Sequence, residues 1–180
     1  MHRLIKAIAH STRRIRRRDD GVTAVEFAMV APVFLFLIFA ILETSLMFVV
    51  ATVMQGEVAI ASRVIRTGQL QEGDDALGTF TELLCGNLDN VLSCENVIID
   101  VRTFDDFGEM EFDQFVDEDG SASGNEFDPG GADKIVLVRI AYLYNTVTPF
   151  LDQLLTTDAS GNVMLFAGTA FKNEPFKSTP

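Results

Sequence analysis

One stretch near the N-terminus decides the fold: Arg16-Arg17-Arg18-Asp19-Asp20-Gly21-Val22-Thr23-Ala24-Val25-Glu26-Phe27. A basic segment ends at Gly21, and an apolar segment that contains one early carboxylate, Glu26, follows directly. A secretory signal peptide is cut beyond its apolar core. Here the glycine precedes the core, so a cut between Gly21 and Val22 would leave the apolar segment attached to the mature chain.

The apolar segment predicts one long helix. Residues 27–42 carry no charge, and mostly apolar sequence continues to Met54, which exceeds the roughly 20 residues needed to span a bilayer. From Met47 onward, apolar residues recur at alternating spacings of four and three, which places them on one face of a helix: Met47, Ala51, Met54, Val58, Ala61 and Ile65. We expect a helix from about Thr23 to Arg66, roughly 65 Å long, that ends near Gly68. Its lower half would lie in lipid and its upper half under a head.

The same residues resemble a class III leader of the type IV pilin superfamily. More closely, they resemble the TadE/TadG-like pseudopilins of tight-adherence (Flp, type IVb) pilus systems. The helix of that family typically reads small residues, Val-Glu-Phe-Ala, a proline, a leucine-rich run and a second glutamate. This chain has residues 24–28, Pro32, residues 33–42 and Glu43 at those places. The resemblance covers about residues 13–68.

The resemblance implies that a prepilin peptidase cuts after Gly21, so that Val22 becomes the N-terminus and Glu26 the fifth residue. It implies a minor pseudopilin that takes part in pilus initiation or forms the tip. Its partners would be the peptidase and other pilins and minor pseudopilins of the system. The major Flp-type pilins are much smaller than this chain, which favours a minor component.

Three residues of the helix are candidates for a role in assembly. The superfamily resemblance implies that Glu26 pairs with the α-amino group of Val22 in a neighbouring subunit; alternatively, Glu26 lies at the headgroup boundary and favours the helix dipole. Pro32 removes a helix hydrogen bond and acts as a hinge, or is a tolerated membrane proline. Glu43 contacts a different partner helix, or lies hydrated at the outer interface.

Charge and cysteines predict the topology. Residues 1–21 hold seven of the 14 Lys and Arg, whereas residues 22–180 hold seven against 24 acids. The basic leader should stay cytoplasmic, giving a single-pass protein of the bacterial inner membrane with a periplasmic head. So acidic a chain is a poor candidate for nucleic-acid binding. Cys85 and Cys94 fall on the periplasmic side, where we expect a disulfide worth about 2–3 kcal/mol; two buried thiols are the alternative.

The remaining sequence predicts an α+β head. The domains are then a leader over residues 1–21, a long helix over 22–68 and an acidic head over 69–180. Within the head we expect a helix from Asp74 to Leu84 that Cys85-Gly86-Asn87 breaks, and a helical turn over residues 150–155. Alternating patterns predict strands near residues 97–102, 135–144 and 163–172, which form a small antiparallel sheet packed on the upper helix, as in pilins.

An acidic insertion separates the first two strands. Residues 105–128 hold ten acids and no Lys or Arg. Phenylalanines interrupt the insertion or flank it: Phe104, Phe107, Phe112, Phe115 and Phe127. Such a segment is usually a solvated loop, whereas its aromatics favour contact with a partner. A calcium site that includes Asp117 and Asp119 is a weak third possibility, because the later spacing of an EF-hand is missing.

The sequence does not favour an enzyme. Both histidines, His2 and His10, lie in the leader, and no phosphate-binding glycine loop is present, so we expect neither catalysis nor a cofactor. Two alternatives to a pseudopilin remain. The first is an uncleaved single-pass anchor whose acidic head binds a partner or surface ligand. The second is a secreted protein cut after Ala61, although the preceding apolar stretch is far longer than a signal core.

Overall fold

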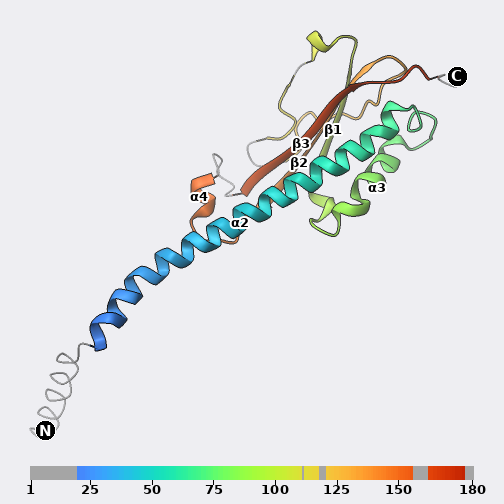
Figure 1. Ribbon diagram of the computed structural model, residues 1–180. Helices are drawn as coiled ribbons and strands as arrows, with labels where there is room; N and C mark the ends of the chain where they lie inside the picture. The colour runs from blue at the N-terminus through green and yellow to red at the C-terminus, as the bar shows by residue number, and fades with distance from the viewer. Residues whose placement is uncertain (1–19, 111, 118–120, 156–161, 177–180) are drawn as a thin grey trace, which may run out of the picture. The chain divides into compact units, whose positions relative to one another are not determined.

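The computed structural model describes residues 20–110, 112–117, 121–155 and 162–176. The described elements are α2 (Asp20–Arg66), α3 (Ala76–Leu88), η1 (Cys94–Asn96), β1 (Val97–Phe104), η2 (Phe107–Glu109), β2 (Ile135–Asn145), α4 (Leu151–Leu155) and β3 (Asn162–Lys172). The chain divides into two compact units, Met1–Leu42 and Glu43–Pro180. The long N-terminal helix and the small antiparallel sheet confirm the predicted α+β, pilin-like fold (Figure 1).

Helix α2 runs without interruption from Asp20 to Arg66, through Pro32. Its C-terminal end is fixed by Gly68, which has φ +81°. A Cβ atom built on Gly68 would clash with the ring of Phe176. Both the left-handed backbone and the ring therefore require glycine, which explains why the helix stops where the sequence predicts.

The head, Glu43–Pro180, is built on a three-stranded sheet with the order β1-β2-β3 and antiparallel pairing throughout. Central strand β2 is buried on both faces. One face of β2 joins α2 and α3 in the main core through Val136, Val138 and Ile140. The other face contributes Ala141 to a smaller core with Phe115 and Val116 of the acidic insertion. The predicted seam of α2 is confirmed, because Met54, Val58, Ala61 and Ile65 are fully buried in the main core.

Helix α3 begins where Asp75 accepts a hydrogen bond from the backbone of Gly78, at 2.8 Å. It continues through Cys85-Gly86-Asn87 to Leu88, so the predicted break at these residues is wrong. An isolated glycine lowers helix stability by only about 1 kcal/mol. Burial of Leu84 and Leu88 in the main core offsets that cost.

Each outer strand of the sheet makes hydrogen bonds to another segment at one residue of its free edge. Along β1, Val101 donates to Glu126 O and accepts from the N–H of Asp128, both at 2.8 Å. Along β3, the side-chain amide of Gln55 on α2 bonds both the N–H and the C=O of Gly168, at 3.2 and 3.0 Å. These contacts satisfy backbone groups that an open edge would leave available for pairing with another chain.

Candidate functional site

The predicted processing and assembly residues lie in the first turns of α2. Gly21 and Val22 are in its first turn, and a Cβ atom built on Gly21 would meet nothing within 4 Å. Glu26 and Pro32 are both exposed within the chain. The structure thus leaves these four residues without cover from the rest of the described chain, and their intermolecular roles stay predictions.

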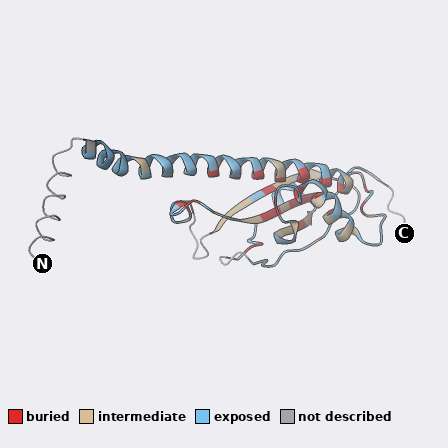
Figure 2. Ribbon diagram, turned by 90° about the horizontal axis from the view of Figure 1, so that it is seen from below, coloured by how far each residue is buried: buried red, intermediate tan, exposed pale blue. Residues whose placement is uncertain are grey.

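The large apolar side chains around them are exposed as well. Phe27 is 73% exposed and Met29 74%, and the pattern continues through Leu42 (Figure 2). Among the described residues one helix, Gly21–Arg66, is long and apolar enough to cross a membrane. An exposed apolar surface on all sides of a helix is typical of a segment surrounded by lipid or by other helices.

Glu43 lies in a different environment from Glu26. It is 5% exposed, and its carboxylate accepts hydrogen bonds from the backbone N–H groups of Val147 and, at 2.6 Å, Thr148. Burial, followed by the charge of Glu43, raises the pKa of Tyr144 above its ordinary value. The carboxylate of Glu43 therefore binds the backbone of the head within the same chain. Neither interpretation of the sequence included this contact. Contact of Glu43 with a partner helix stays a prediction.

Two polar residues of upper α2 are also buried, although they lie off the apolar seam. Glu57 is 8% exposed and accepts a hydrogen bond from Nδ2 of Asn87 at 3.2 Å, and Ser62 is 4% exposed. The head covers more of the helix circumference than a narrow seam requires. The heptad-like spacing could not reveal this, because it records only the apolar contacts.

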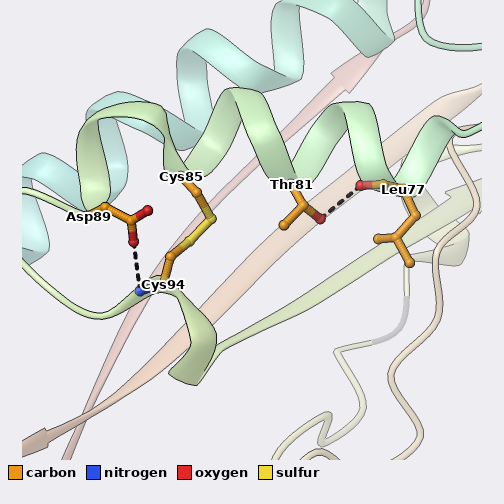
Figure 3. The surroundings of a disulfide bond; sticks show 5 residues. All are labelled: Leu77, Thr81, Cys85, Asp89 and Cys94. Carbon is orange, nitrogen blue, oxygen red and sulfur yellow. Dashed lines mark hydrogen bonds between the residues drawn. A yellow bond between two sulfur atoms is a disulfide. The ribbon is translucent and has the colours of Figure 1, made fainter.

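The structure joins Cys85 and Cys94 in a disulfide, with Cα atoms 5.8 Å apart (Figure 3). The bond ties α3 to η1, the short turn that leads into β1. Beside it, the carboxylate of Asp89 accepts a hydrogen bond from the backbone N–H of Cys94 at 3.1 Å. The link thus holds the start of the sheet against the end of α3.

The acidic insertion is anchored to the outer face of the sheet by an ion network. Asp100 is fully buried and lies opposite Arg139 in the β1–β2 register. Its carboxylate bonds Arg139 at 2.6 Å and Arg102 at 3.1 Å, and it also accepts from the N–H of Glu126. Burial opposes the charge of Arg102, but the hydrogen bond and charge of Asp100 outweigh it and raise the pKa of Arg102.

The two arginines also reach the insertion itself. Arg102 donates to Gly124 O at 2.8 Å, and Arg139 donates to Asp113 O at 2.9 Å and lies over the ring of Phe115. The described part of the insertion is therefore anchored to the sheet at several points, although most of its residues are exposed. The sequence contains a signal for this network, since Asp100 and Arg102 interrupt an apolar strand, but the same alternation is typical of an ordinary half-buried strand.

The phenylalanines of this region fall into two groups. Phe115 is 5% exposed, and Phe127 packs on Phe80 of α3 with ring centres 5.6 Å apart. Phe107 and Phe112 are exposed. Some of these phenylalanines thus pack inside the head, and others are exposed. The sequence alone could not distinguish packing within the head from contact with a partner.

The weak calcium candidates gain no support. Asp117 is exposed and donates its N–H to Ser121 O, while Asp119 lies outside the described residues. Within the described parts of the chain, no group of three or more His, Cys, Asp and Glu side chains is placed to hold a metal ion.

Comparison with known proteins gives one match. Residues 21–63 match the family model described as TadE-like protein, so the match begins at Gly21 and stops before the head. No curated protein and no solved structure is significantly similar to the chain. Over these residues the chain is TadE-like, which, with its α+β pilin-like fold, is consistent with a TadE/TadG-like protein of the tight-adherence pilus system.

Proposed function

We propose that this chain is a minor pseudopilin that a prepilin peptidase cuts between Gly21 and Val22 and that then takes part in initiating or forming the tip of a tight-adherence pilus. One observation carries the proposal. The TadE-like match begins at Gly21, and from that residue an exposed apolar helix extends to the head.

The position of the cut suits a protease. Gly21 and Val22 are exposed in the described part of α2, and a Cβ atom built on Gly21 would meet nothing within 4 Å. Cleavage there removes the basic leader and keeps the apolar rod intact.

Cleavage also creates a partner for Glu26. The new α-amino group of Val22 and the carboxylate of Glu26 are both costly in hydrocarbon when unpaired. Glu26 is exposed and close to the start of α2, so its carboxylate is available to the amine of a neighbouring subunit. We propose that this pair sets the axial position of one rod against the next, with the head on the periplasmic side and the leader in the cytoplasm.

The test separates processing from assembly. Glu26→Gln removes the charge and keeps the shape, so cleavage should proceed while incorporation into sheared pili falls sharply. Glu109→Gln, in the head, is the matched control, because it removes one carboxylate far along the sequence from the cut. Unchanged incorporation of the Glu26→Gln protein would refute the pairing. Loss of cleavage without loss of pili would refute the processing step.

A further inference from the structure

The head has an apolar patch that the proposed function does not use. It consists of the β2–α4 turn and α4, where Val147 is 86% exposed, Phe150 67%, Leu154 71% and Leu155 43%. We call these four residues the tip patch. Residues 145–151 carry no charged side chain, and Asp152 is the one charged residue within the stretch from Val147 to Leu155.

Hydrogen bonds attach the tip patch to α2 at Glu43. The backbone N–H groups of Val147 and Thr148 both bond the carboxylate of Glu43, and Leu151 is buried beside them. Glu43 is the residue that directly follows the charge-free run ending at Leu42. Residues 22–42 form about 31 Å of helix at 1.5 Å per residue, close to the thickness of the hydrocarbon layer.

The apolar surface continues along α2 at the same level. Leu46, Phe48 and Val49 are 57%, 71% and 54% exposed, although they follow Glu43. Between residues 50 and 66 the head covers one side of the helix, and Ile60 is the one large apolar side chain of this range that the structure leaves largely exposed. The exposed apolar surface therefore ends just above the level of the tip patch.

We propose that the tip patch inserts into the headgroup layer of the bilayer that holds the N-terminal helix, and so seats the head on the membrane surface. Apolar side chains enter this boundary to a depth of roughly 5–10 Å, and aromatic rings favour it. Phe150 occupies the left-handed region, with φ +68°, although that region favours glycine. The side chain of Phe150 is nevertheless 67% exposed. The contact needs only the helix in lipid and does not depend on cleavage after Gly21.

The chain offers a direct probe, because it contains no tryptophan. Phe150→Trp is placed in the full-length protein in phosphatidylcholine vesicles that carry nitroxide-labelled lipid, with the spin label near the headgroup. The matched control is Phe112→Trp, the same substitution at a residue of the acidic insertion that is 72% exposed. Leu154→Trp is a second reporter of the patch for the case in which Phe150→Trp does not fold.

We expect emission from the Phe150→Trp protein to shift to the blue and to be quenched by the shallow nitroxide, and emission from the Phe112→Trp protein to show neither effect. Adding Leu154→Glu to the Phe150→Trp protein should reduce the quenching. Equal quenching of the two single variants would overturn the proposal. A blue shift without quenching would also overturn it, since a second copy of the chain or another protein would then cover the patch.

Discussion

The two halves of α2 are both rich in apolar residues but have opposite surroundings. Met29, in the lower half, is 74% exposed, whereas Met54, in the upper half, is fully buried. The two glutamates differ in the same way, because Glu26 is exposed and Glu43 is buried against the backbone of the head. One continuous helix thus has an exposed lower half and an upper half that is partly buried by the head. Glu43 lies where the change begins.

The difference shows that apolar content alone does not define a core. In the upper half a stripe of apolar residues meets α3 and the sheet, and the polar residue Gln55 adds hydrogen bonds to Gly168 of β3. In the lower half, large apolar residues occupy every side. A stripe is typical of a helix packed on a protein, and uniform coverage is typical of a helix in lipid or in a bundle.

The largest expected effect contrasts the two methionines. Met54→Ala should destabilise the head by about 2–5 kcal/mol, because the change leaves a cavity in the main core. Met29→Ala should leave the unfolding of the head unchanged. The measurement is denaturant unfolding of the full chain in micelles, followed by tyrosine fluorescence. Equal effects of the two substitutions would remove the distinction between the halves.

The disulfide provides a second test, confined to the head. Replacing both Cys85 and Cys94 by serine should lower the free energy of unfolding by about 2–3 kcal/mol, since the closed loop restricts the unfolded chain. Membrane insertion of the lower helix should not change. Carbonate extraction of membranes reports insertion, and the same denaturation assay reports stability. A double variant as stable as the parent would show that the bond does not support the head.

A third prediction compares the two glutamates. Glu43→Gln should destabilise the head by about 1–2 kcal/mol, because a neutral amide accepts the N–H groups of Val147 and Thr148 less strongly than a carboxylate does. Glu26→Gln should not alter the stability of the head. If both variants unfold like the parent, the contact between Glu43 and the β2–α4 turn contributes nothing to the fold.

The smallest effect concerns Tyr144. Its raised pKa means that it should ionise above its ordinary value near 10, and Glu43→Gln should lower that pKa by removing a nearby charge. The folded head then holds a proton that the unfolded chain has released, so stability should fall as pH rises from about 10 through the folded-state pKa. Absorbance at 295 nm follows the two tyrosines of the chain, Tyr142 and Tyr144. An unchanged titration in Glu43→Gln would contradict the proximity.

Local patterns in the sequence were sufficient for the elements of the fold. The seam of α2, the stop at Gly68 and the three strands follow from periodicity and from glycine, which act over short distances. The extent of α3 could not be predicted in the same way. Its last turn is held by burial of Leu88 in a core assembled from distant segments.

The site was only partly predictable for the same reason. The sequence identified Gly21, Glu26 and Glu43 as special, and the match to the TadE-like family begins at the first of them. The partner of Glu43 lies 104 residues away at Val147, and no spacing rule connects the two. The role of Asp100 was equally hidden, because its pairing with Arg139 arises from strand register rather than from sequence proximity.

The central claim is that the chain loses its basic leader and keeps its apolar rod. The most direct measurement is the intact mass and N-terminal sequence of the membrane-associated and pilus-associated protein from cells that make pili. The account predicts a chain that starts at Val22. A chain that still starts at Met1, recovered from cells with normal pili, would contradict it, and a start at Ser62 would show instead a secreted head.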